Sequence, residues 1–171
     1  GKIVIAFAMG TSEFYKWLDH NPMIEALPVS ITNIPFNISQ NDNMVAINSA
    51  LSVDLLGQVA ADTLPGIQFS GVGGQVDFVR GATDSKGGRA IIALPSTAAK
   101  GSVSRIVASL DRGQAVTTSR YDVDYVVTEY GVAHLKWKTN RDRAKALISI
   151  AAPEFREALK YEYNQLYGEI L

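Results

Sequence analysis

The chain has 171 residues and a net charge of −1, with 47% apolar and 19% charged residues. This length and balance are typical of one globular domain, and the near-neutral charge argues against nucleic acid or an anionic membrane as the main partner. Because there is no cysteine and no apolar run of membrane-spanning length, we expect a cytoplasmic protein without a histidine–cysteine metal site.

The first elements of the chain are predicted to be a strand and a short helix. Residues 3–9 (IVIAFAM) are continuously apolar, as in a strand that is covered on both faces. Thr11 or Ser12 can cap a helix that ends before Asn21-Pro22. Since a buried-type strand starts almost at the first residue, we expect the chain to be a piece of a longer protein, cut just before that strand.

The other apolar segments are mostly short and extended. Strands are predicted at residues 28–33, 44–48, 52–56, 89–94, 104–110, 115–118 and 125–128. A turn at Gly57-Gln58 is predicted to form a hairpin with residues 59–61. A short helix is expected after Gly74, and longer helices from Thr139 and Pro153. Apolar strands that alternate with helices predict an α/β domain.

A cluster of three glycines stands out in FSGVGGQVDF, residues 69–78. Gly71, Gly73 and Gly74 lie between an extended run and a helical stretch, where the backbone either turns tightly or lets a ligand come close. N–H groups at such a junction can hold an anion or a developing oxyanion. The GxGG spacing lacks the third glycine of the dinucleotide-binding pattern, so the turn and the ligand site both remain open.

Several common catalytic arrangements are absent. There is no GxSxG nucleophile elbow and no GxxxxGK[ST] phosphate loop. His20 and His134 lie far apart in the sequence, and a helix-end cap and a surface or packing role account for them. A carboxylate metal site is not excluded by composition, but no spaced cluster supports one, and we expect no metal.

Six long segments together resemble the C-terminal domain of the acetyl-CoA hydrolase/transferase family, which includes 4-hydroxybutyrate and acetate CoA-transferases and acyl-CoA hydrolases. The segments are GKIVIAFAMGTSEFYKWLDHNP, NDNMVAINSALSVDLLGQVAAD, GVGGQVDFVRGA, GGRAIIALPSTAAKGSVSRIV, DVDYVVTEYGVAHL and RAKALISIAAPEFREAL. They cover nearly the whole chain in order, which is more specific than any single glycine pattern.

The resemblance implies a fold and a chemistry. It implies that residues 1–171 form one NagB/RpiA-like CoA-transferase domain, with an open, mostly parallel sheet flanked by helices. In the family this is the C-terminal domain of a two-domain enzyme, usually a homodimer. A glutamate attacks the acyl-CoA thioester, CoA converts the resulting anhydride to a glutamyl-CoA thioester, and an acceptor carboxylate takes the CoA. In hydrolases of the family, water attacks instead.

The expected substrates are therefore an acyl-CoA and a short-chain carboxylate, and the expected partners are the enzyme's own N-terminal domain and a second copy. The family's catalytic glutamate lies in a Glu-Met segment, which this chain lacks, so we expect the nucleophile upstream of Gly1. The alternative from another class is a non-catalytic α/β module that uses the glycine-rich site for a nucleotide or a sugar phosphate.

Three residues are catalytic candidates, two of them by their match to family positions. Gly74 matches the glycine whose N–H helps to form the oxyanion hole. Asn33 matches an asparagine near the catalytic glutamate, although an asparagine before Ile-Pro also suits a turn. Glu129 ends a predicted strand, where ligands gather in open α/β sheets, and is expected to orient the site. An ion pair with an arginine such as Arg105 is its structural alternative.

The remaining candidates concern CoA itself. By resemblance, Gly71, Gly73 and Gln75 border the thiol and the pantetheine arm of CoA. Lys100 and Ser102 flank Gly101 on a loop, from which a lysine can reach a CoA phosphate as a mobile point charge. A solvated loop lysine is the alternative for Lys100.

Overall fold

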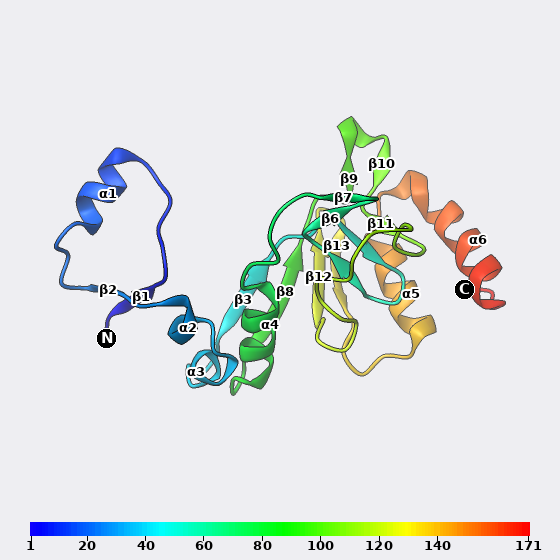
Figure 1. The fold of residues 1–171 in the computed structure, drawn as a ribbon. Helices are drawn as coiled ribbons and strands as arrows, with labels where there is room; N and C mark the ends of the chain where they lie inside the picture. The colour runs from blue at the N-terminus through cyan, green and yellow to red at the C-terminus, as the bar shows by residue number, and fades with distance from the viewer.

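The computed structural model describes residues 1–171 as a small N-terminal lobe, residues 1–27, beside a larger body (Figure 1). The lobe is a strand–helix–strand unit in which β1 (Ile3–Ile5) pairs in parallel with β2 (Ile24–Ala26). Helix α1 (Ser12–Leu18) joins the two strands, and the Thr11 side chain accepts a hydrogen bond from the Phe14 N–H at its start. The predicted cap and helix are therefore confirmed.

The larger body is built around a four-stranded sheet with the order β13-β12-β8-β3. Strands β3 (Val45–Asn48), β8 (Arg89–Ala93) and β12 (Tyr125–Thr128) are parallel, and β13 (Gly131–His134) runs antiparallel to β12. The expected α/β fold with a mostly parallel sheet is confirmed, including all three parallel strands.

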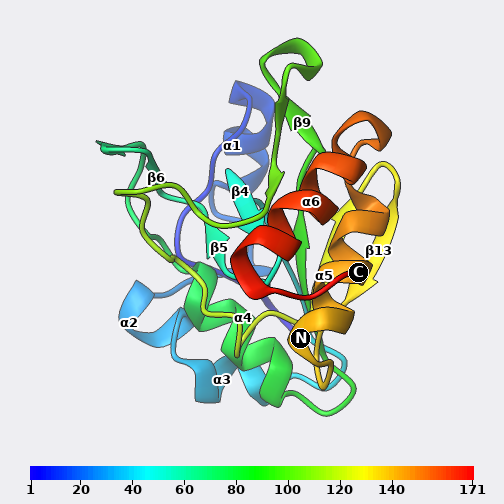
Figure 2. The ribbon, with the colours of Figure 1, turned by 90° about the vertical axis from the view of Figure 1, so that its right-hand side faces the viewer.

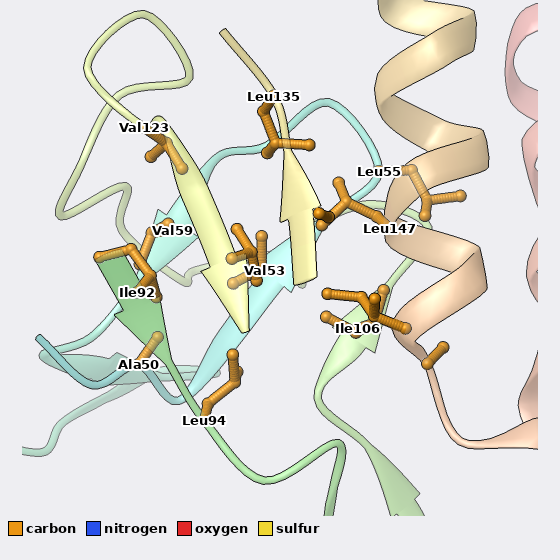
Figure 3. Packing of buried hydrophobic residues seen from close by; sticks show 14 of the residues in the cluster. Ala50, Val53, Leu55, Val59, Ile92, Leu94, Ile106, Val123, Leu135 and Leu147 are labelled. Atoms are coloured by element: carbon orange, nitrogen blue, oxygen red, sulfur yellow. The ribbon is translucent and has the colours of Figure 1, made fainter. Parts of the chain in front are cut away.

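Helices cover this sheet and enclose one apolar core. Helix α4 (Gln75–Asp84) packs on β8 and β3, and α3 (Pro35–Ser39) packs on α4. Helix α5 (Asn140–Ile150), capped by Thr139, packs on β13 and β12 and is followed by the turn η2 (Pro153–Phe155) and α6 (Arg156–Tyr167). The core that joins these layers includes fully buried Val53, Ile106 and Leu147 (Figure 3).

Smaller strands extend from the body. A second sheet has the order β11-β4-β5, formed by β11 (Ile106–Val107), β4 (Ser52–Asp54) and β5 (Val59–Ala60). The predicted hairpin at Gly57-Gln58 joins β4 to β5. Two surface hairpins follow: β6 (Thr63–Leu64) with β7 (Ile67–Gln68), and β9 (Thr97–Ala98) with β10 (Val103–Ser104), which flank the turn η1 (Ala99–Gly101). No helix is long and apolar enough to cross a bilayer.

Three sequence predictions were wrong in ways that matter for the site. Residues 28–33 form helix α2 (Val29–Thr32) rather than a strand, because their N–H groups bond to carbonyls four residues back, including Thr32 to Pro28. Residues 115–118 make only one bridge, between Val59 and Thr118. Residues 104–110 divide between β10 and β11, which belong to different sheets.

The apolar run at residues 3–9 is a fourth error. Only residues 3–5 are extended and paired, and Phe7 and Met9 are 75% and 81% exposed. The run stays exposed because β1 pairs only with β2, and the lobe adds no residue to the buried core of the larger body. An apolar run indicates that a strand will be covered, but it does not say by what.

Candidate functional site

A pocket of about 330 Å³ lies between the N-terminal lobe and the start of α4. Its walls come from four separate parts of the chain: the end of β1, the end of α2, the carboxyl end of β3 and the first turn of α4. The lining residues are Val4, Ile5, Ala6, Phe7, Thr32, Asn33, Asn48, Gly74, Gln75 and Phe78. The carboxyl ends of parallel strands are where open α/β sheets place their ligands.

Asn33 and Gly74 meet in this pocket, although 41 positions separate them in the sequence. Asn33 ends α2, and Gly74 is the residue from which α4 begins. The Asn33 amide lies so close to Gly74 that a β-carbon there would overlap its Nδ2 atom. The Thr32 hydroxyl donates to Asn33 Oδ1 at 2.9 Å, which orients the amide and leaves its Nδ2 hydrogens available to a ligand.

The backbone at the glycine cluster is also available for binding. Gly73 has a φ of +64°, a left-handed conformation that favours glycine, and produces the turn before α4. The N–H groups of Gly71, Gly73 and Gly74 donate no hydrogen bond within the chain. N–H groups at the start of a helix are suited to binding an anion. The pocket thus combines free backbone donors at Gly74 with a side-chain amide donor from Asn33.

No lining residue of this pocket is an acid or a base. The single hydroxyl group among the lining residues, that of Thr32, is hydrogen-bonded to Asn33. The pocket can therefore hold a carbonyl oxygen and stabilise negative charge on it, because fixed donors lower the energy of a developing oxyanion. It supplies no nucleophile and no proton-transfer group of its own.

The chain resembles CoA-transferases in sequence and in structure. The profile of the acetyl-CoA hydrolase/transferase C-terminal domain matches residues 10–163. The chain belongs to this acetyl-CoA hydrolase/transferase family. It is 60% identical to the 4-hydroxybutyrate coenzyme A transferase of Clostridium kluyveri over 98% of this chain, and 53% identical to the succinyl-CoA:cyclohexane-1-carboxylate CoA transferase of Geobacter metallireducens over 93%.

Solved structures show the same family likeness. RipA from Yersinia pestis superimposes with a TM-score of 0.91 at 47% identity, over 98% of this chain and 38% of that chain. The 4-hydroxybutyrate CoA-transferase from Porphyromonas gingivalis gives a TM-score of 0.79 at 47% identity, over 97% of this chain and 38% of that one. The chain spans 39% and 36% of the two sequence relatives, so it matches a little over a third of each.

Gln75, expected at the CoA arm of the acetyl-CoA hydrolase/transferase family, has a largely internal side chain. Its Nε2 donates to the Thr118 hydroxyl at 3.1 Å, and both residues are buried. This bond ties the first turn of α4 to the segment beside β5. Gln75 still lines the pocket, and its contact with CoA stays a prediction.

Glu129 lies outside the pocket, at the turn between β12 and β13. Its two carboxylate oxygens accept hydrogen bonds from Ser96, at 2.9 Å from the backbone N–H and 2.6 Å from the hydroxyl. These bonds lower the pKa of Glu129 below its ordinary value, with the hydroxyl contributing most. The alternative pairing with Arg105 is wrong, because the Arg105 guanidinium donates to the Ala50 carbonyl instead.

The hydrogen bonds between Ser96 and Glu129 predict a measurable pH effect. A carboxylate with a lowered pKa adds stability above its ordinary value of 4.5 and loses it as the pH falls through the lower value of the folded state. We expect Ser96→Ala to raise the pKa of Glu129 toward 4.5 in an NMR titration of the carboxyl carbon, and to flatten the fall in stability below that pH. An unchanged pKa would show that the Ser96 hydroxyl does not bind Glu129 in solution.

Lys100 and Ser102 are not brought to the pocket either. Both are exposed at the tip of the β9–β10 hairpin, which projects from the molecule (Figure 2). Lys100 has a φ of +57° beside Gly101 at +93°, so the tip is tightly turned, and the Ser102 hydroxyl donates to the Ala99 carbonyl. That Lys100 and Ser102 of this chain bind a CoA phosphate stays a prediction.

Asn48 is a pocket residue that sequence reasoning missed. It is the last residue of β3, and its side chain has no hydrogen-bond partner within the chain. A polar residue that ends an apolar strand, as in MVAIN, was the available signal. Its amide adds a third polar group to the wall formed by Asn33 and Gly74.

Proposed function

We propose that this chain is the CoA-binding C-terminal domain of an acyl-CoA:carboxylate CoA-transferase that works through a glutamyl-CoA thioester. The observation that carries the proposal is the meeting of Asn33 with the free N–H groups at Gly74. These donors suit the oxygen of a thioester carbonyl. Membership of the family supports the reaction class.

The proposed reaction needs stabilisation of an oxyanion at two stages. A glutamate carboxylate attacks the thioester carbon, and the tetrahedral intermediate collapses to an anhydride as the CoA thiolate leaves. The thiolate then attacks the glutamyl carbonyl and releases the acyl group as a carboxylate, and the acceptor carboxylate reverses these steps. Gly74 and Asn33 donate to the oxyanion each time, and one fixed donor of this kind contributes roughly 3 kcal/mol.

The nucleophile is proposed to lie outside this chain, in a segment before Gly1. Two observations support this placement: the pocket contains no acid or base, and the chain spans 39% of its Clostridium kluyveri relative. We propose that this chain pairs with an N-terminal domain of the same enzyme, and that the enzyme is a cytoplasmic homodimer. The exposed apolar side chains of β1, Phe7 and Met9 are suited to such a partner surface.

Hydrolysis is the second candidate activity. The acetyl-CoA hydrolase of Candida albicans is 26% identical over 91% of this chain. That identity is well below the 60% of the Clostridium kluyveri transferase. The same donors at Gly74 would serve attack by water on the anhydride. Transfer is preferred on the higher identity, and the choice between them depends on whether the assembled site excludes water.

The proposal is tested by trapping the intermediate. The full-length enzyme that contains this chain is incubated with acyl-CoA and reduced with borohydride, and its peptides are analysed by mass spectrometry. We expect a modified glutamate in a peptide that precedes Gly1, and no turnover by the 171-residue chain alone. Trapping at Glu129, or full activity of the isolated chain, would contradict the placement of the nucleophile.

A further inference from the structure

A second cavity, of about 520 Å³, lies at the other end of α4 from Gly74. It includes the last turns of α4, the residues before β12 and those after β13. The ten residues of α4 place the two ends of this helix about 15 Å apart. The C-terminal end of α4 and the start of α5 both lie away from the β9–β10 hairpin (Figure 1, Figure 2). The two sites share no lining residue, so this cavity is separate from the Gly74 pocket.

Trp137, on the wall of this cavity, has an unfavourable backbone conformation and an unusually exposed side chain. Its φ is +63°, in the left-handed region that a bulky residue rarely adopts, and it is 91% exposed. Tyr121, on the same wall, is 85% exposed. A strained backbone conformation costs about 1 kcal/mol or more and tends to occur where the structure presents a residue to a ligand.

The cavity also has an excess of positive charge. Arg80 pairs with Asp122 at 3.1 Å, and Asp84 is the only other carboxylate on the wall. Lys136 and Arg143 have no carboxylate partner. The ammonium of Lys136 lies 5.8 Å from the centre of the Trp137 ring, so a cation and an exposed aromatic ring stand side by side.

Arg143 is the more unusual of the two unpaired cations. Its Nη1 donates to the carbonyls of Arg120 and Leu56, at 2.8 and 3.3 Å, which fixes the guanidinium in place. Burial, followed by repulsion from Arg120, lowers the pKa of Arg143. Because this partly buried guanidinium is held in place and has no carboxylate partner, it can pair with an anion bound beside it.

We propose that this cavity binds a small anion that carries a planar aromatic ring, which is the chemistry of a nucleotide. The ring stacks on Trp137 or Tyr121, and the phosphate groups lie between Lys136 and Arg143. The volume suits a ligand of this size. Arg80 and Thr83, from α4, and Pro35, from α3, also line the cavity. The proposal does not depend on the glutamyl-CoA mechanism.

A free nucleotide and the nucleotide part of CoA share this chemistry, and the experiment separates them. In the 171-residue chain carrying Trp17→Phe, Trp137 is the one remaining tryptophan, so its fluorescence reports on the cavity. ADP, GDP and UDP are titrated separately. Adenosine, which has the ring without phosphates, and inorganic pyrophosphate, which has the phosphates without a ring, are titrated as the two halves of the probe. We expect saturable quenching by at least one nucleotide, and at least tenfold weaker binding of each half. If CoA displaces that nucleotide, CoA is the source; if both bind together, a free nucleotide is.

Variants examined by calorimetry complete the test. Trp137→Gly removes the ring and relieves the left-handed strain, so it is expected to fold normally and to weaken nucleotide binding at least tenfold. Lys136→Glu should weaken it similarly, and Lys16→Glu on α1, the same charge reversal at an exposed lysine, should not. The proposal is overturned if no nucleotide binds, if Trp137→Gly binds equally well, or if Trp137 is instead covered by self-association in concentrated protein.

Discussion

Gly74→Ala is expected to lower kcat/KM for CoA transfer by roughly 100-fold or more in the full-length enzyme. A β-carbon at this position would overlap the Asn33 amide, so either the amide or the start of α4 must move. Both hold donors that we assign to the oxyanion, and loss of one such donor costs other enzymes about 100- to 1,000-fold in kcat. Steady-state kinetics with acyl-CoA and a carboxylate acceptor measure the effect.

The double variant Gly74→Ala/Asn33→Ala separates a steric effect from a catalytic one. Because the overlap involves the Asn33 side chain, its removal makes room for the new β-carbon. We expect urea unfolding to show that stability lost in the single variant returns in the double variant, while the rate stays low because the amide donor is gone. A near-wild-type rate in Gly74→Ala would remove these donors from the mechanism.

The parts of the fold with local signals were predictable from the sequence. Thr11 and Thr139 cap helices where their side chains can accept an N–H from the first turn, and the parallel strands are apolar runs bounded by turns. Strand β13 was missed because GVAH, residues 131–134, is short and its antiparallel pairing depends on the turn at Glu129-Tyr130. Helix α2 was missed because its β-branched residues favour strands, whereas the local hydrogen bonds and Pro28 favour a helical turn.

The candidate site was only partly accessible to sequence reasoning. The glycine cluster indicated a turn or a ligand, and the family resemblance assigned Asn33 and Gly74 to the site separately. Their contact was not predicted, since nothing local in PVSITN indicates a neighbour 41 residues away. Trp137 lies in LKWKT, where no glycine marks a left-handed residue. Strain and exposure of this kind depend on the packed position of the β13–α5 connection, which is a tertiary property.

Gly81→Ala, in the middle of α4, tests how the helices that carry the site are held together. Intrinsic helix propensity predicts that alanine would stabilise this position by about 1 kcal/mol. Packing predicts the opposite, because a β-carbon there would lie 2.5 Å from Cβ and Cγ2 of Ile38 and 3.1 Å from the Pro35 carbonyl oxygen. Ile38 is buried in α3, and its Cβ cannot swing away without the backbone. Overpacking of this kind costs about 1–3 kcal/mol.

We therefore expect Gly81→Ala to lower the free energy of unfolding by about 1–3 kcal/mol in urea, despite the better helix former. Ser149→Ala, at an exposed position of α5, is the matched helix-surface control and should change stability by no more than about 0.5 kcal/mol. A more stable Gly81→Ala would mean that α3 does not lie against α4 in solution. Since Asn33 is two residues before α3 and Gly74 begins α4, that result would also separate the two donors on which the proposed chemistry depends.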